Sequence, residues 1–476
     1  MIRPLRLKQE DQTKLYGNYL SAGLGNYQSF FAEGAVATKR DKTKMIGADF
    51  FWRSSGKGPV DESHSANSST RVMLFGKRVM DAVTMSGDLT YLNQRNYFYG
   101  YAPGTDIDRD LLKQVYETFA ARAGIENSRE ATLDYKLDVG YSHLRDAYVS
   151  TEGQFSMKFN GTYALEGNRS VVLDADAFLI NRKDSLFSES RNLVHLRPSY
   201  SLRPMDKLSL SLGINMALQN DVFSESNSLN VYPNVSGRYE ASEKIALYAS
   251  ISGDIDRVNM HTLTALNPWL KANSSITNTN RALDFQAGVE ANIGSKLTTR
   301  IGAGFATLKN LYFFQTVRDP FNPAGIPVGA DVDKFELVYD KATGRMNPYM
   351  EATYNESDVF SMTLRADYFK YTTETIAQAW HRPTYRTDLQ LKYSLYSKLI
   401  FQAGIVAQGG MVALDPVVGE VTLQQAFDVN FRTRYFFSKQ ISAFIQFDNL
   451  LSNQYPLYLS YPTRGFQALV GASWSF

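Results

Sequence analysis

The chain has 476 residues, and its 50 lysines and arginines nearly balance its 48 aspartates and glutamates. This balance gives no basic surface of the kind that nucleic-acid binding requires, so we expect no nucleic acid among the partners. The sequence contains no cysteine, which excludes disulfides, thiol catalysis and thiolate metal sites.

β-Strands are expected along nearly the whole chain, because apolar and polar residues alternate with a period of two. In 465–476, for example, Phe466, Val470 and Trp474 share one face, and Gln467 and Ser473 share the other. In chain order, the expected strands are 16–24, 27–38, 43–54, 70–79, 82–97, 113–126, 130–142, 153–164, 168–181, 191–202, 207–217, 227–239, 244–254, 284–293, 296–315, 335–354, 358–370, 383–393, 397–408, 424–437, 440–450 and 465–476.

The strand at 113–126 has an alternative, because the spacing in 111–124 also suits an amphipathic helix. Counting it as a strand keeps short and long connections in alternation. The short turns are expected at 39–42, 165–168, 204–206, 241–243, 294–295, 355–357 and 438–440. The long loops are expected at 54–69, 98–112, 255–283, 316–334, 371–382, 409–423 and 451–464.

These strands indicate a membrane barrel. Many of them run for about ten to fourteen residues, the length of a tilted crossing, and they carry charges on one face. In a bilayer only a closed barrel satisfies every backbone group of a sheet. We therefore predict an all-β fold, a single closed antiparallel transmembrane β-barrel of about 22 strands in the bacterial outer membrane, with short periplasmic turns and long extracellular loops. Its expected parts are a short N-terminal periplasmic segment, 1–15, and the barrel, 16–476.

Aromatic residues near the strand ends are expected to form a girdle at the membrane boundary, where a ring lies in lipid and its polar atom in water. The members of this girdle are Tyr163, Tyr239, Tyr354, Tyr368, Tyr393, Tyr435 and Trp474. Trp269 and Trp380 fall in long loops instead, where they could close the mouth of the barrel or contact a partner.

No catalytic, cofactor or metal site is predicted. The five histidines, His64, His143, His195, His261 and His381, show no ligand spacing. Asp174 and Asp176 could form a carboxylate pair, but a ladder of charges in the lumen with Lys158 explains them better. We expect no enzyme activity and no cofactor.

The C-terminus carries a resemblance to a known family. The final strand, with Gly471, Trp474 and the terminal Phe476, resembles the signal that the barrel assembly machinery recognises. The preceding hairpin resembles the last hairpin of TonB-dependent outer-membrane receptors, as do the elements ALNPWL (265–270) and NTN (278–280). The matching hairpin positions are Asn449, Leu450, Asn453, Tyr455, Tyr461, Pro462 and Gly465.

Members of that family carry an N-terminal plug and a TonB box, and neither is recognised before the first expected strand. The segments 16–31 and 54–69 are similar to compact receptor-like barrels of the Bacteroidota that lack the plug. The resemblance therefore implies an accessory or scaffold subunit of a larger outer-membrane complex, in barrel assembly, secretion or lipoprotein-associated machinery. One alternative is the barrel of a TonB-dependent nutrient transporter whose plug is absent from this chain, and a second is a passive porin.

The partners implied are outer-membrane lipid, lipopolysaccharide, and other outer-membrane proteins or lipoproteins. Because the open lumen of a barrel of about 22 strands would breach the permeability barrier, the loops 255–283 and 316–334 are expected to fold inward and occlude it.

Overall fold

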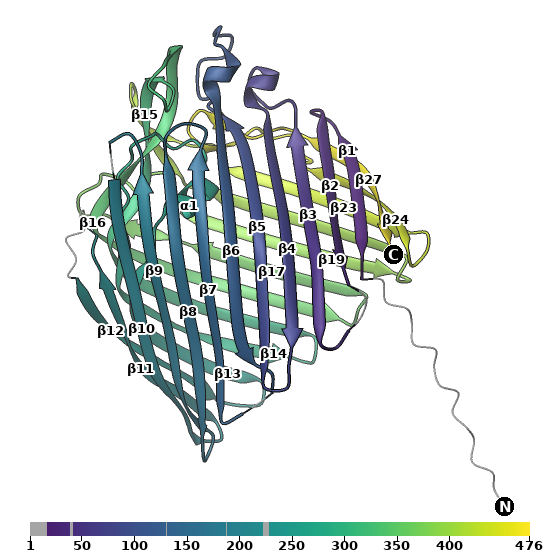
Figure 1. The fold of residues 1–476 in the computed structure, drawn as a ribbon, viewed down its shortest axis with the longest axis vertical. Helices are drawn as coiled ribbons and strands as arrows, with labels where there is room; N and C mark the ends of the chain where they lie inside the picture. Colours follow the sequence, from purple (N-terminus) through teal and green to yellow (C-terminus); the bar gives the residue numbers. More distant parts are fainter. Residues whose placement is uncertain (1–16, 39–40, 130, 187, 222–227) are drawn as a thin grey trace, which may run out of the picture.

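A computed structural model describes residues 17–38, 41–129, 131–186, 188–221 and 228–476 (Figure 1). The expected N-terminal segment 1–15 and residues 39–40 of the first short turn lie outside the described residues. None of the helices in these ranges is long and apolar enough to cross a membrane.

The described strands form one large antiparallel sheet that closes on itself. Its 23 strand segments make 22 strands, because β18 (Lys370–Thr372) continues β17 (Phe360–Tyr368) along the same neighbour, β16 (Pro327–Glu356). The first strand, β1 (Tyr19–Gly25), pairs with the last, β27 (Gln467–Ser475), with Leu20 opposite Trp474. The predicted fold class and strand number are confirmed.

Each expected strand is present, and most bounds lie within about three residues of the prediction. The remaining barrel strands are β2 (Ser29–Ala37), β3 (Lys44–Ser55), β4 (Asn67–Val79), β5 (Val83–Tyr97), β6 (Lys113–Asn127), β7 (Leu133–Asp146), β8 (Thr151–Leu165), β9 (Arg169–Lys183), β10 (Ser188–Met205), β11 (Leu208–Gln219), β12 (Leu229–Glu240), β13 (Ile245–Asp256), β14 (Thr279–Ile293), β15 (Leu297–Phe321), β19 (Tyr385–Leu395), β20 (Leu399–Gly409), β23 (Ala426–Phe436) and β24 (Ile441–Asp448). The segment with the ambiguous spacing, 111–124, is strand for most of its length.

The loops carry the few other elements. These are the helix α1 (Met260–Leu266), the single 3₁₀ turns η1 (Glu62–Ser65) and η2 (Arg109–Leu112), and the short strand pairs β21 (Val412–Asp415) with β22 (Gly419–Thr422) and β25 (Pro456–Tyr458) with β26 (Tyr461–Pro462). All of them lie at the end of the barrel opposite the short turns.

The prediction of a long loop at 316–334 is wrong. β15 and β16 continue through most of it as a hairpin that rises above the rest of the barrel, leaving only 322–326 as the turn (Figure 1). The prolines in this segment suggested a loop. A proline is tolerated here because the hairpin extends past the neighbouring strands. Its outer edges have no further strand to pair with, so the missing N–H of a proline removes no hydrogen bond there.

The two faces of the barrel differ as the alternation predicts. Large apolar side chains such as Leu24, Leu89 and Val470 are exposed on the outside, and the charged partners at the intervening positions face the lumen. Because a closed sheet with an apolar outer face matches a bilayer, the chain is a bacterial outer-membrane barrel. The end with the short turns is then periplasmic, and the end with the long loops is extracellular.

Candidate functional site

The extracellular loops meet in a buried apolar cluster, which we call the mouth core. Its members come from the extracellular ends of β5, β15 and β16 and from the connections 56–66, 98–112, 257–278 and 449–466. They are Ala66, Tyr97, Phe98, Tyr99, Tyr101, Ile107, Leu112, Val258, Leu263, Leu270, Ile276, Phe314, Val328, Val332, Phe335 and Tyr461.

Aromatic rings occupy the centre of the mouth core. The ring of Tyr461 stacks on Trp269 with centroids 4.1 Å apart, and Tyr99 lies 4.8 Å from Tyr461. Phe335 is fully buried beside them, with its ring 5.6 Å from Tyr461. The Tyr461 hydroxyl donates to the carbonyl of Asp333 at 2.6 Å, so its burial leaves no unpaired polar atom.

Hydrogen bonds across the barrel show that these loops meet over the lumen. Trp269 Nε1 donates to the carbonyl of Tyr97 at 2.9 Å, and the Tyr116 hydroxyl donates to the carbonyl of Pro268 at 3.1 Å. These bonds join β5 and β6 to the connection between β13 and β14, which are separated by many strands around the ring. The expectation that 255–283 folds inward is therefore confirmed, and Trp269 takes part in the closure.

One arginine, Arg191, fixes both ends of the loop 257–278 by hydrogen bonds. Arg191 on β10 pairs with Asp221 through two hydrogen bonds of 2.7 and 3.1 Å. It also donates to the carbonyl of Val258 at 3.0 Å and to Asn278 Oδ1 at 2.9 Å. Asp221 in turn accepts from the backbone N–H of Asn278 at 2.6 Å. The beginning and the end of the loop are thus fixed to the same buried ion pair.

A second wall residue fixes the start of α1. Glu152 on β8 is fully buried and accepts from the N–H of Met260 at 2.9 and 3.1 Å. His261 Nδ1 lies 2.9 Å from the same carboxylate. The helix is therefore anchored to the wall at its first residues, beside the Arg191 ion pair.

His381 lies in the loop 373–384, beside the mouth core. Its Nδ1 lies 2.7 Å from the carbonyl of Phe314, and the N–H of Leu459 donates to its Nε2 at 3.3 Å. A carbonyl only accepts, so Nδ1 carries the proton and Nε2 is unprotonated. Burial lowers the pKa of His381 to about 4, against which the carbonyl of Phe314 acts only weakly. The ring is neutral at neutral pH.

The periplasmic half of the lumen has a different character, because its arginines stay partly exposed where they pair with carboxylates along the wall. Arg238 Nη2 lies 2.7 Å from Glu290 Oε1, and Arg300 Nη2 lies 2.9 Å from Glu290 Oε2. Further along, Arg365 Nε lies 2.7 Å from Asp367 Oδ2. Such a ladder keeps the wall hydrated and adds little to stability.

Two tyrosines lie flat on this wall. The hydroxyls of Tyr248 on β13 and Tyr349 on β16 are 2.6 Å apart, and they meet across β14 and β15. A Cβ at Gly288 would lie 2.2 Å from the Tyr248 hydroxyl, and one at Gly302 would lie 2.6 Å from it. Glycine at both positions is what allows the rings to lie against the backbone.

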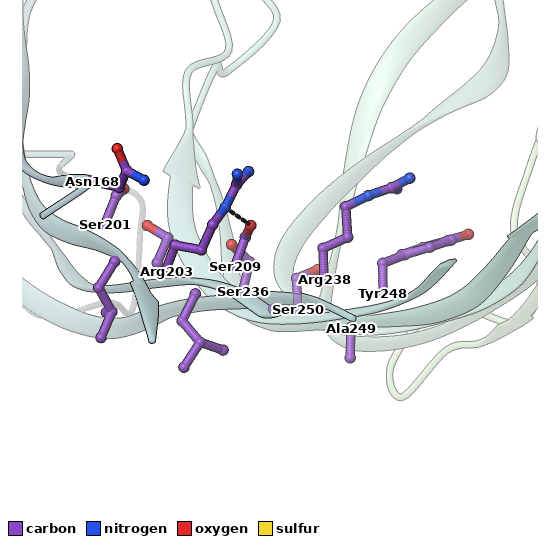
Figure 2. Close-up of a pocket in the computed structure, with 13 residues that line it drawn as sticks. Asn168, Ser201, Arg203, Ser209, Ser236, Arg238, Tyr248, Ala249 and Ser250 are labelled. Atoms are coloured by element: carbon purple, nitrogen blue, oxygen red, sulfur yellow. Dashed lines mark hydrogen bonds between the residues drawn. The ribbon is translucent and has the colours of Figure 1, made fainter. Parts of the chain in front are cut away.

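Next to this bridge the wall forms an open groove of about 650 Å³ (Figure 2). Arg203 and Arg238 rise from a floor of serines on β10 to β13, and Arg203 Nε donates to the Ser209 hydroxyl at 3.3 Å. The short serine side chains leave the lumen wide at this level.

The family-like residues of the last hairpin lie together at the mouth. Asn449 is buried, and its side chain donates to the carbonyls of Asn453 and Arg464 and accepts from the N–H of Asn453. Tyr455 donates to Asp428 at 2.8 Å, and Pro462 accepts from the Tyr99 hydroxyl at 3.3 Å. The other two positions, Leu450 and Gly465, also lie in the loop 449–466: Leu450 is exposed, and a Cβ at Gly465 would lie 2.6 Å from the Ser452 hydroxyl.

The predicted assembly signal lies on the strand that closes the barrel. A Cβ at Gly471 would lie 2.3 Å from the carbonyl oxygen of Ala22 and 2.4 Å from the Phe444 ring, so glycine permits close pairing there. The rings of Trp474 and Phe476 stack at 4.4 Å. Recognition of these residues by an assembly machine stays a prediction.

The predicted girdle residues lie mostly at one end of the barrel. Tyr163, Tyr239, Tyr354, Tyr393, Tyr435 and Trp474 lie within the last three residues of strands that end at the short turns. Tyr368 lies at the extracellular end of β17. All but Tyr354, which is half-buried, are exposed. Their role at the membrane boundary stays a prediction.

The candidate carboxylate pair is divided between two networks. Asp176 contacts His195 Nδ1 at 2.6 Å and Arg197 Nη1 at 2.5 Å, whereas Asp174 accepts from Asn160. Lys158 is opposite Asp176 in the register, but Arg197 on β10 forms the ion pair with Asp176. In the part of the chain that the structure describes, no group of three or more His, Asp or Glu side chains is placed to hold a metal.

The residues that fix the mouth were largely missed by the sequence reasoning. Glu152, Arg191 and Asp221 lie at strand ends with no spacing pattern among them. One signal was present, because Asn278 belongs to the NTN element and Trp269 to the ALNPWL element. Both elements take part in closing the mouth.

No family model matches the sequence, and no curated protein matches it. Solved structures match in fold over nearly the whole chain. The FrpB iron transporter from Neisseria meningitidis superposes with a TM-score of 0.75 at 9% identity, covering 97% of this chain and 82% of that chain. The ferric-catecholate import receptor Fiu from E. coli K12 gives a TM-score of 0.72 at 11% identity, with the same coverage of 97% and 82%. The siderophore receptor PirA from Pseudomonas aeruginosa gives 0.65 at 11% identity, covering 96% and 80%. At such low identities the likeness shows a shared fold.

Proposed function

We propose that this chain is the barrel of an outer-membrane uptake receptor whose extracellular mouth is closed at rest. The observation that carries the proposal is the mouth core, in which loops from distant strands pack together over the lumen. A passive porin needs an open mouth, so this packing argues against the porin alternative. A closed mouth above a wide, hydrated lumen suits a barrel that opens only for a selected solute.

The comparisons support a proposal for the substrate class. The three proteins reported above are described as an iron transporter, a ferric-catecholate import receptor and a siderophore receptor. By analogy of fold, the solute is a ferric siderophore. The resemblance of the last hairpin supports energy coupling through TonB, on the alternative in which a plug accompanies this barrel. That the barrel works without a plug, and that it is of the Bacteroidota type, stay predictions.

A reversible lock on the mouth tests the proposal. The Ser460 hydroxyl and Asp333 Oδ2 are 2.6 Å apart, so the pair Ser460→Cys and Asp333→Cys should form a disulfide between the loop 449–466 and β16. The chain has no native cysteine, so no other thiol competes. We expect cells that carry the pair to take up radiolabelled ferric catecholate only after reduction. Each single cysteine variant is the control. Unchanged uptake in a strain that lacks the protein would overturn the proposal.

The accessory-subunit alternative has one observation in its favour. Val417 and Val418, at the tip of the β21–β22 hairpin, are 69% and 73% exposed on the extracellular side. Exposed apolar residues at a loop tip suit a protein partner. Purification from native outer membranes in gentle detergent, with mass determination of the intact particle, decides between the two functions. Partners at fixed stoichiometry, with uptake unaffected by deletion, would establish the accessory function.

A further inference from the structure

Three cations lie together on the lumenal wall of β19, β20 and β23. Lys392 is opposite Gln402, and Gln402 is opposite Arg432, so these residues form one row across neighbouring strands. Arg434 follows Arg432 on the same face, one step nearer the periplasmic end. Strands in a sheet are about 4.8 Å apart, so the backbones of Lys392 and Arg432 are about 10 Å apart, within reach of a single bound group.

Within the residues that the structure describes, these three cations have no carboxylate ion-pair partner, unlike several other lumenal cations. Arg122 and Arg365 each have a carboxylate oxygen at 2.7 Å, and so does Arg238. Among the described residues, no carboxylate forms an ion pair with Lys392, Arg432 or Arg434. Glu33 on β2 acts on Arg434 electrostatically without forming an ion pair. Like charges gathered on one wall repel each other, which an anion between them would relieve.

Arg432 also has an unused donor. Its Nε is buried and has no hydrogen-bond partner. A buried guanidinium N–H without a partner is unfavourable, and an anionic oxygen is the acceptor that suits it best.

The support beneath the arginines is rigid. The guanidinium carbons of Arg432 and Arg434 lie 4.9 and 5.5 Å from the centre of the Phe444 ring. Phe444 is buried, because its ring packs against Gly471 and makes an edge contact with Phe31. A fixed ring beneath two guanidinium groups limits their conformational freedom.

We propose that Lys392, Arg432 and Arg434 form a binding site for an anionic solute on the lumenal wall, near the periplasmic end. Its ligand is a small solute that carries carboxylate, phosphate or sulfonate groups. This inference deepens the proposed function and rests on it, because it names the charge of the solute that passes through the barrel.

Binding of the trisulfonated dye pyranine to the full chain in detergent tests the site, with fluorescence anisotropy as the readout. The triple variant Lys392→Gln, Arg432→Gln and Arg434→Gln should weaken binding at least about tenfold at low salt, where such charges are least screened. The matched control is Arg122→Gln, Arg238→Gln and Arg365→Gln, which removes the same net charge from paired positions. It should change the affinity less than about twofold.

Equal loss of affinity in the two triple variants would overturn the inference, because the lumen would then act only through its total charge. Unchanged binding in the first variant would also overturn it. Correct folding of each variant is read from its heat-dependent mobility on a detergent gel, and single substitutions replace a triple variant that fails to fold. Uptake in cells tests the proposed function separately, so a barrel that imports its solute but does not bind pyranine at this wall contradicts this inference alone.

Discussion

Ion pairs occur in both halves of the lumen, but they lie in opposite surroundings. At the extracellular end the side chains of Arg191 and Asp221 are 4% and 1% exposed, and they fix the two ends of the loop 257–278. At the periplasmic end the side chains of Lys77 and Glu126 are 43% and 36% exposed, and their ion pair joins only nearby strands of the wall. A buried pair is costly to break because one charge is left uncompensated, whereas an exposed pair is worth little. The extracellular half of the lumen is therefore packed like a protein interior, whereas the wall of the periplasmic half resembles a solvated surface.

The largest effect is expected when one buried aromatic ring is removed from each half of the lumen. Phe335→Ala takes a fully buried ring from the mouth core, which costs about 3–5 kcal/mol. The loops should then separate, and conductance in planar bilayers should rise. Phe444→Ala, its matched control, removes a buried ring from the periplasmic half and should leave conductance unchanged while lowering thermal stability. Equal conductance of the two variants would show that the mouth core does not close the barrel.

Replacing one basic residue in each half separates buried from exposed ion pairs. Arg191→Ala leaves Asp221 buried without its partner, a loss of about 3–5 kcal/mol, so hydrogen exchange in 257–278 should increase by orders of magnitude. Lys77→Ala should change stability by less than about 1 kcal/mol, because both Lys77 and its partner Glu126 are exposed to water. If hydrogen exchange in the loop 257–278 increased equally in both variants, the Arg191–Asp221 ion pair would not be what fixes this loop.

Acid should loosen the mouth through His381. Its pKa in the folded protein, about 4, lies below its ordinary value of 6.5, so the open form binds the proton more tightly. Stability of the closed mouth is thus complete above pH 6.5 and falls as the pH drops towards 4, by up to about 3 kcal/mol at about 1.4 kcal/mol per pH unit. Conductance measured between pH 7 and pH 4.5 should rise. His381→Gln, which cannot titrate, should flatten the profile, and an unchanged profile would assign the effect to other groups.

The smallest expected effect is at the closing pair of strands. In Gly471→Ala the new methyl group would meet Ala22 and Phe444 at 2.3 and 2.4 Å, and such overpacking costs about 1–3 kcal/mol. Gly304→Ala is the matched control, since its nearest neighbour would be 3.6 Å away. The temperature at which each barrel unfolds on a detergent gel measures the difference. A similar temperature for both would show that the β1–β27 pair tolerates the methyl group.

Much of the barrel could be predicted because its signal is local. A period of two is read within about ten residues, and turns such as 294–296 interrupt it clearly. The segment 316–334 was misread because its prolines normally break strands, and nothing nearby shows that this hairpin extends past the rim.

The mouth could not be predicted in the same way, because its contacts join residues that are far apart in sequence. Tyr99 donates to Pro462, 363 positions away, and Arg191 reaches Asn278 from 87 positions away. The local alternation of apolar and polar residues gives no information about contacts between such distant positions. The last-hairpin residues and the NTN element were noticed only through a family resemblance, and Glu152 and Arg191 carried no signal at all.

The position of Tyr461 also couples the seal of the mouth to the closure of the barrel. This residue lies at the centre of the mouth core, and it belongs to the connection just before β27, the strand that pairs with β1. The loops 98–112 and 257–278 therefore share their central ring with the segment that leads into the closing strand. A change that displaces β27 would also displace the ring on which the other loops pack.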